Sequence, residues 1–210
     1  MKKNKLFIIG LVTVFVALLS LTLVSSTFAK YVTTGNGSAS ARVAKWGFSS
    51  ATIEFNDLFK ESYTNVKSSV TGEKVIAPGT NGTATFAFGH DDTSGAPEVA
   101  YTLTVSTEGS SCDASIKNNK NIIWKLDNVA CASWDDLLEK IAALAKNGKG
   151  TNEYEAGTLP TNFDGNAHTI TWEWTFSADA EGDKADTNMG NATTLASVTL
   201  KITVTATQID

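Results

Sequence analysis

The chain has 210 residues, of which 42% are hydrophobic, and its formal net charge is −5. This length suits a single domain with a sizeable core. The 22 acidic residues outnumber the 17 basic ones, so the composition argues against a protein that binds nucleic acid or anionic membrane surfaces.

The N-terminus has the pattern of a secretory signal peptide. Lysines cluster within the first five positions, and residues 6–24 that follow carry no charge. Thr27 and Ala29 are small residues at the −3 and −1 positions of a cleavage site between Ala29 and Lys30. We expect residues 1–29 to be removed during export, which leaves 14 basic against 22 acidic residues, a net charge of −8.

An uncleaved membrane anchor is the alternative reading of the same segment. The charge-free run is long enough, because a transmembrane helix needs about 20 apolar residues. However, Lys30 stands alone before a stretch rich in threonine, glycine and serine, so no basic stop-transfer cluster follows. With either outcome we expect the rest of the chain outside the membrane, attached to it only through an uncleaved signal.

Residues 41–210 contain short segments in which apolar and polar residues alternate. Such alternation, with threonine on the outer face, is typical of half-buried strands in antiparallel sheets. Turn dipeptides such as Asn81-Gly82 separate the segments. We predict an all-β domain, a β-sandwich of jelly-roll or immunoglobulin-like topology. The expected strands are residues 41–48, 51–56, 83–88, 99–105, 121–126, 169–176 and 198–207.

One inserted segment has helical spacing instead. In SWDDLLEKIAALAKNGKG the apolar residues recur three and four positions apart, as at Leu137 and Ile141. Ser133 is placed as the N-cap, and Gly148 is placed to terminate the helix. The pattern predicts a short α-helix within residues 133–147. We interpret its apolar stripe as a lid over one end of the sandwich, with a docking face as the alternative.

Two cysteines, Cys112 and Cys131, lie in the exported part of the chain. In an oxidising exterior we expect them to form a disulfide, which would close a loop worth about 3 kcal/mol in the chain-entropy description. Two buried or unpaired thiols are the alternative. A single disulfide is not a scaffold, so the hydrophobic core must hold the domain together.

No catalytic motif is recognisable in the sequence. The two histidines, His90 and His168, are far apart and form no H-E-x-x-H zinc pair. We interpret His90 with Asp91 and Asp92 as a solvated turn. The acidic stretch 179–186 places alternate carboxylates around a glycine, as a calcium loop does, but lacks the EF-hand spacing, and we interpret it as a solvated hairpin loop. We therefore predict no enzyme activity, no bound metal and no cofactor.

Several segments together resemble a family of exported Gram-positive proteins. They are the signal ending in FAKYV, the following SASARVAKWGF, the strand ITWEWTF, the segment ADTNMGN and the closing VTLKITVTATQID. This family is exported through an alternative signal peptidase of the SipW type and includes the TasA/camelysin biofilm-matrix proteins. The likeness does not extend to the middle of the chain, with its cysteines and helix. It implies a jelly-roll β-sandwich, secretion to the cell surface or extracellular matrix, and assembly into fibres.

In fibre-forming members of that family, the segment freed by signal cleavage acts as a donor strand for the neighbouring subunit. A free extended N-terminus can add main-chain hydrogen bonds to an exposed sheet edge, and a head-to-tail contact that does not close produces filaments. The expected partners are the signal peptidase and further copies of the chain. The alternative is that residues 30–40 are a disordered leader. The donor residues implied by the resemblance are Lys30, Tyr31, Val32, Thr33 and Thr34, within the flexible segment 30–40.

Two classes of function stay open at this stage. The favoured one is a non-enzymatic structural protein of the cell surface or biofilm matrix. The alternative is a monomeric surface-binding module, an adhesin or carbohydrate-binding protein, that uses its loops or tryptophans. We expect Trp46, Trp124, Trp172 and Trp174 to pack in the core or on a sheet face instead. Some family members are metal-dependent proteases, but this sequence has no zinc-peptidase motif to receive that activity.

Overall fold

The computed structural model describes residues 32–36, 48–49, 53–55, 57–90, 96–160, 162 and 167–209. The chain divides into two units, Met1–Tyr31 and Val32–Asp210. All described residues belong to the second unit, so the predicted signal peptide and the cleavage pair Ala29 and Lys30 lie outside them.

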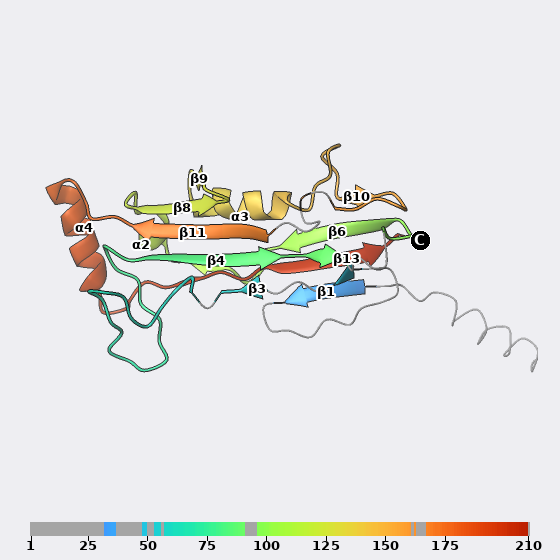
Figure 1. The fold of residues 1–210 in the computed structure, drawn as a ribbon. Coiled ribbons are helices and arrows are strands. Elements are labelled where there is room, and N and C mark those ends of the chain that lie inside the picture. Colours follow the sequence, from blue (N-terminus) through green and yellow to red (C-terminus); the bar gives the residue numbers. More distant parts are fainter. Residues whose placement is uncertain are drawn as a thin grey trace, which may run out of the picture. The chain divides into compact units, whose positions relative to one another are not determined.

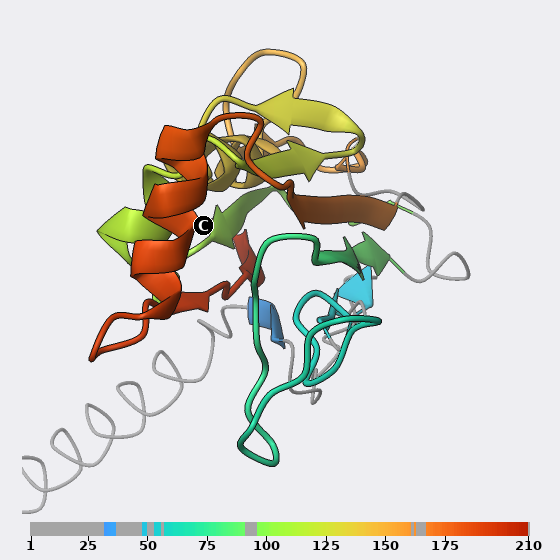
Figure 2. The ribbon, with the colours of Figure 1, turned by 90° about the vertical axis from the view of Figure 1, so that its left-hand side faces the viewer.

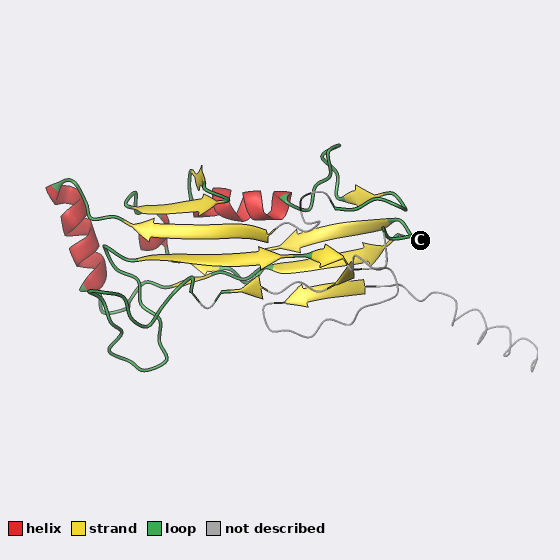
Figure 3. Ribbon diagram, viewed as in Figure 1, coloured by secondary structure: helices red, strands yellow, loops and turns green. Residues whose placement is uncertain are grey.

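The regular structure of the described residues is dominated by antiparallel strands, most of which lie in two larger sheets (Figure 1, Figure 3). The strand order is β3-β4-β11-β8-β9 in the five-stranded sheet and β1-β13-β6-β10 in the four-stranded sheet, and two small sheets pair β2 with β5 and β7 with β12. The predicted all-β class is confirmed. The strands are β1 (Val32–Asn36), β2 (Phe48–Ser49), β3 (Ile53–Glu54), β4 (Asn81–Ala87), β5 (Gly89–His90), β6 (Tyr101–Ser106), β7 (Ser111–Cys112), β8 (Ile122–Leu126), β9 (Val129–Cys131), β10 (Glu153–Tyr154), β11 (Ala167–Trp174), β12 (Val198–Thr199) and β13 (Thr203–Gln208).

Strand β11 is the centre of the five-stranded sheet. Buried residues alternate with more exposed ones along its whole length. It pairs with β4 over residues 167–173 and with β8 over residues 170–174. The period-two pattern read from the sequence is therefore the pattern of one face packed inward, as expected for an antiparallel sheet.

Gly82 allows the Leu58 backbone and the Trp172 indole to lie very close to strand β4. It lies opposite Trp172, whose Nε1 donates a hydrogen bond to the Leu58 carbonyl oxygen at 2.5 Å. A Cβ atom on Gly82 would lie 1.9 Å from that oxygen and 2.6 Å from the indole nitrogen. Any larger residue would push the backbone at Leu58 away, so this strand position requires glycine.

One core cluster includes buried side chains from both larger sheets. The rings of Tyr101 and Tyr154 stack 5.0 Å apart, and Trp124 meets Trp134 edge-on at 4.8 Å. Trp124, Trp172 and Trp174 are buried, as predicted, whereas Trp46 lies outside the described residues. The largest fully buried side chains are Trp172, Tyr101, Phe48, Phe86, Phe88, Leu58, Leu103, Ile116, Leu137, Ile141 and Ile170.

Helix α3 (Trp134–Ala143) confirms the predicted inserted helix and its N-cap. Ser133 Oγ accepts a hydrogen bond from the Asp136 backbone N–H at 3.1 Å. The apolar stripe includes the buried Leu137 and Ile141, and the helix contacts β6, β8 and β9. It therefore packs on the core, as the lid interpretation required.

The end of α3 differs from the prediction. The helix stops at Ala143, whereas the sequence placed its end near residue 147 with Gly148 as the terminator. The backbone N–H groups of residues 144–146 each donate to the carbonyl three residues earlier, which tightens the chain out of the α-helical pattern. Gly148 lies beyond this turn and does not cap the helix.

The acidic stretch 179–186 is helical, so its interpretation as a hairpin loop was wrong. Helix α4 (Ala180–Gly190) begins after Asp179, whose Oδ1 accepts a hydrogen bond from the Gly182 N–H at 2.7 Å. Two further acidic residues in the first turn favour the positive end of the helix dipole. Apolar periodicity is weak here, and the start signal is the capping aspartate. A third helix, α2 (Ala114–Lys117), is a single turn.

Two strand predictions also change in detail. The segment predicted as one strand, 198–207, is split into β12 and β13, because Ser110 Oγ bonds both the N–H and the carbonyl oxygen of Lys201 in place of a neighbouring strand. Strand β11 ends at Trp174, and Phe176, predicted to be within the strand, is 74% exposed. The predicted strand 41–48 lies almost wholly outside the described residues.

None of the helices in the described part of the chain has the length and apolar character needed to cross a membrane.

Candidate assembly strand and the surrounding polar sites

The N-terminal strand β1 lies at the edge of the four-stranded sheet, beside the C-terminal strand β13 (Figure 1). The two strands are antiparallel, with Val32 opposite Thr207 and Asn36 opposite Thr203. This pairing joins the two ends of the second unit within one chain. It also shows that the segment after the predicted cleavage site has a strand partner inside its own domain.

The predicted donor segment is therefore described only in part. Its last three residues are the first three of β1, and Gly35 and Asn36, which belong to the segment 30–40 predicted to be flexible, continue the strand. The predicted donor residues Val32, Thr33 and Thr34 lie in β1, whereas Lys30 and Tyr31 lie outside the described residues.

Strand β13 is held firmly on its other side. It pairs with β6 over six residues, from Thr203 opposite Ser106 to Gln208 opposite Tyr101. Val204 is 1% exposed and Ala206 is fully buried, because this face of β13 belongs to the core. The edge that accepts β1 is thus preformed by the rest of the domain, which lowers the ordering cost of adding a strand.

Strand β1 has a single strand neighbour among the described residues, since it is the terminal strand in the sheet order. The connection from β1 to β2 runs through residues 37–47, which lie outside the described residues. An edge strand attached through one ladder is the kind of element that can pair with another chain.

The two cysteines are free thiols in this structure, so the predicted disulfide is not formed in it. Cys112 is in β7 opposite Val198, and Cys131 is in β9 opposite Trp124. Burial, together with the nearby Asp113 carboxylate, raises the pKa of the Cys112 thiol to about 11, and burial also raises the pKa of Cys131. Both thiols are therefore poor nucleophiles at neutral pH.

His168 and Asp127 form a polar pair that the sequence did not indicate. His168 Nδ1 lies 2.8 Å from Asp127 Oδ2, and its Nε2 lies 2.8 Å from the Asn162 carbonyl oxygen. Asp127 Oδ1 also accepts the Thr169 backbone N–H at 2.8 Å. With one ring nitrogen on a carboxylate and the other on a backbone carbonyl, the imidazole is positioned as a structural link between loops and not as a base for a neighbouring nucleophile.

Asp186 of α4 is the buried carboxylate of the molecule's described part. It is 8% exposed and accepts hydrogen bonds from Asn119 Nδ2 at 2.7 Å and from Asn121 Nδ2 at 3.3 Å. The two amides partly compensate for the burial of its charge. In the described residues, no three histidine, cysteine, aspartate or glutamate side chains gather as a metal site would require. Asp91 and Asp92 lie outside that search.

Comparisons with protein-family models, with curated proteins and with solved structures found no significant match to this chain. The proposal for its function therefore depends on the sequence pattern and on the geometry described above.

The resemblance implied a donor segment at the N-terminus, but the sequence did not indicate which strand lies beside it. Residues 203–207 were predicted as a strand, yet an alternating pattern does not say which other strand lies beside it. The contact between Asp127 and His168, and that between Asn119 and Asp186, join residues distant in sequence, and no local signal could have revealed them.

Proposed function

We propose that the mature chain is an exported structural protein of the cell surface or biofilm matrix. In this proposal it assembles into fibres when β1 leaves its own β13 and pairs with the β13 of the next subunit. The observation that carries the proposal is the five-residue register of an N-terminal edge strand on a preformed neighbour. The resemblance of the signal and the C-terminal strands to the TasA/camelysin proteins supports it.

We further infer that the two larger sheets form a β-sandwich of the jelly-roll kind. The support is that both sheets contribute to one core and that strands adjacent in the sheets come from distant parts of the chain, as in β1 with β13 and β4 with β11. An immunoglobulin-like arrangement is the alternative topology.

The backbone energy of the β1–β13 ladder should be nearly the same in the monomer and in the fibre. The ladder between residues 32–36 and 203–207 is the same whether both strands belong to one chain or to two. Ordering the segment costs about 1–2 kcal/mol per residue of backbone entropy in both cases. Subunit concentration and contacts that exist only between subunits must therefore favour the fibre, and breaking the internal ladder sets the barrier.

The connection between β1 and β2 sets how far β1 can reach from its own domain. Residues 37–47 could span on the order of 35–40 Å when extended, at 3.3–3.6 Å per residue. Removal of the signal would then act as the assembly switch, because a β1 tethered to the membrane through residues 1–31 has a restricted reach. Processing by a dedicated signal peptidase would release it.

Paired cysteines provide the test. In a mature chain with Cys112→Ser and Cys131→Ser, we would introduce Thr34→Cys and Thr205→Cys, which are direct partners in the ladder. Oxidation of the dilute monomer should lock β1 on its own β13 and abolish fibres in electron micrographs. Reduction should restore them.

Two controls make the result specific. The out-of-register pair Asn36→Cys with Thr207→Cys should not form the internal bond. A mixture of chains carrying only Thr34→Cys with chains carrying only Thr205→Cys should give disulfide-linked dimers in fibres. Fibres that form equally well from the oxidised, locked monomer would refute strand exchange, and the surface-binding alternative would become the better proposal.

A further inference from the structure

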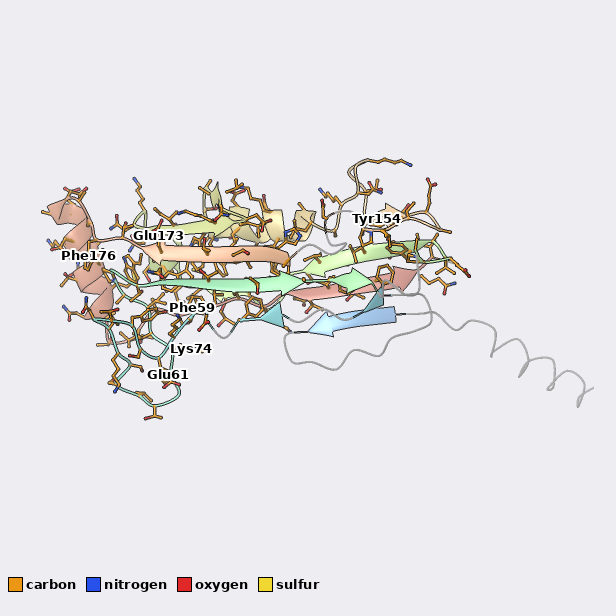
Figure 4. The ribbon with its side chains drawn as sticks, in the orientation of Figure 1. Phe59, Glu61, Lys74, Tyr154, Glu173 and Phe176 are labelled. Atoms are coloured by element: carbon orange, nitrogen blue, oxygen red, sulfur yellow. The ribbon has the colours of Figure 1, made fainter. Side chains whose placement is uncertain are left out.

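The two most exposed of the large apolar side chains in the described part of the chain lie just before and just after α4. Phe176 is 74% exposed and Leu195 is 69% exposed, and α4 lies between them in the sequence. Figure 2 faces this end of the sheets, and Figure 4 labels Phe176 there. Contiguous apolar surface that is left in water marks an interaction site in a soluble protein.

Both side chains belong to one surface, which we call the α4 face. A Cβ atom on Gly79 would lie 2.8 Å from the Phe176 ring, so this ring lies against Gly79. Pro78, the residue before it, lines one hollow with Phe176 and a second hollow with Leu195 and Met189. The α4 face therefore consists of Pro78, Phe176, Met189 and Leu195.

Strand β1 points toward the end of the molecule that carries α4 (Figure 1). Its last residue, Asn36, lies opposite Thr203, the first residue of β13. The chain reaches β13 from α4 through β12. When β1 of a neighbouring copy occupies this edge, the neighbour's chain therefore leaves the ladder at the end nearer to α4.

The domain of the neighbouring copy has to follow from that exit point. Residues 37–47 connect β1 to β2 and reach at most about 40 Å when extended. The neighbour's domain is thus confined to that distance from Asn36. The direction of β1 places the α4 face on the side of the receiving subunit from which the neighbour emerges.

A contact at the α4 face would supply what strand exchange by itself lacks. The β1–β13 ladder is the same in the monomer and in the fibre, so it does not favour either one. In the monomer, Phe176 and Leu195 remain in water. Burial of these side chains against a second subunit would remove apolar area from water only in the fibre, and this stabilises association.

We propose that the α4 face is the contact between neighbouring subunits in the fibre, and that its occupant is a second copy of this chain. Burial of Phe176 and Leu195 there favours the exchanged state over the closed monomer. This inference rests on the proposed strand exchange, because the direction of β1 gives the position of the neighbour.

The first experiment maps the contact by photo-cross-linking of the full mature chain. Leu195→p-benzoylphenylalanine and Phe176→p-benzoylphenylalanine each place a photoreactive side chain on the α4 face. Irradiation of fibres should give cross-linked dimers, whereas the disulfide-locked monomer should give none. Val129→p-benzoylphenylalanine is the matched control, because Val129 is 60% exposed on the edge strand β9, away from α4. It should give few dimers.

The second experiment measures the critical concentration for fibre formation. Leu195→Glu should raise it about tenfold or more, because a charged side chain replaces an apolar one that the contact buries. Phe176→Glu should act in the same direction. Val129→Glu adds the same charge at a similar exposure and should change the critical concentration less than twofold. Far-ultraviolet spectra and thermal unfolding establish that each variant is folded.

The outcomes separate this contact from the strand exchange on which it rests. If the fibres depend on release of the locked β1 but Leu195→Glu assembles normally, or position 129 cross-links as well as position 195, the α4 contact is refuted and the exchange stands. If the locked monomer forms fibres that cross-link at position 195, the exchange is refuted and the contact stands. A mature chain that forms neither fibres nor cross-linked dimers refutes both.

Discussion

The centre of the five-stranded sheet and the β1–β13 edge are built from the same kind of ladder but are secured in different ways. At the centre, Trp172 pairs with Gly82 on one side and with Trp124 on the other, and its indole is tied to Leu58. At the edge, β1 has one strand neighbour among the described residues, and its ladder is five residues long.

The two regions should differ in whether their hydrogen bonds can break without unfolding of the whole domain. Side-chain packing on both neighbours makes β11 inseparable from the rest of the core, so its hydrogen bonds should break only when the domain unfolds. A single edge ladder can open while the core stays folded. A strand that is exchanged between subunits needs this second property.

The largest effect should come from Gly82→Ala. The added methyl group would overlap the Leu58 carbonyl and break its bond with Trp172. We expect the free energy of unfolding to fall by about 3 kcal/mol or more, because both overpacking and a lost buried hydrogen bond contribute. Urea unfolding followed by tryptophan fluorescence measures it.

Gly148→Ala is the matched control, because a Cβ atom there would meet no atom within 4 Å. The same measurement should change by about 0.5 kcal/mol or less. If the two alanine variants were equally stable, the tight packing at the centre of the sheet would be contradicted.

Deletion of residues 30–36 should have a smaller effect on stability. The lost ladder is offset by the backbone entropy of a freed segment, and we expect a decrease of about 1–2 kcal/mol with an unchanged β-rich spectrum. The deletion should abolish fibres.

Within the intact chain, hydrogen exchange should be faster for the β1 amides than for the β11 amides, and equal protection of the two strands would argue against local opening.

Point substitutions in β1 refine this expectation. Val32→Pro removes a backbone donor from the segment, whereas Thr33→Ser leaves every backbone group in place. Fibre growth followed by light scattering should therefore slow much more for Val32→Pro. Similar growth rates for the two variants would contradict a ladder-based contact.

Removal of the helix caps should have smaller effects on stability, and these should also differ between a helix packed on the core and a peripheral one. Ser133→Ala removes the cap of α3, which is packed on the core, and should lower the free energy of unfolding by about 1 kcal/mol. Asp179→Ala removes the cap of α4, whose only buried residue is Asp186, and should show mainly as faster exchange near Gly182. Equal losses of global stability would contradict this assignment.

At neutral pH the smallest effect on stability should come from the thiols, because their contribution changes only at alkaline pH. The pKa of Cys112 is raised to about 11 in the folded chain, above the ordinary value of about 8.5. The unfolded chain therefore loses its thiol proton first, and stability should fall as the pH rises from about 9 to 11. At pH 8, alkylation of Cys112 should be on the order of 100-fold slower than that of a free thiol. If the thiols are instead oxidised to a disulfide, alkylation without reductant leaves the mass unchanged.

The pattern of the sequence predicted the elements best where side chains and backbone depend on their immediate neighbours. Alternation located β4, β6, β8, β11 and most of β13, and a capping serine before an apolar stripe located α3. It failed at α4, where the helix has little apolar periodicity and depends on its capping aspartate, and at Lys201, where Ser110 interrupts the strand. The interrupting residue lies far away in sequence, so the break could not be seen locally.

The sequence by itself determined the all-β class and the inserted helix, because periodicity, capping and turn chemistry act over a few residues. Only the tertiary structure decided that β1 lies on β13, that the Trp172 indole has its acceptor at Leu58, and that Asp186 of α4 is buried against Asn119 and Asn121. These features depend on which distant segments the fold brings together, and a strand pattern is satisfied by many partners while the core permits one arrangement.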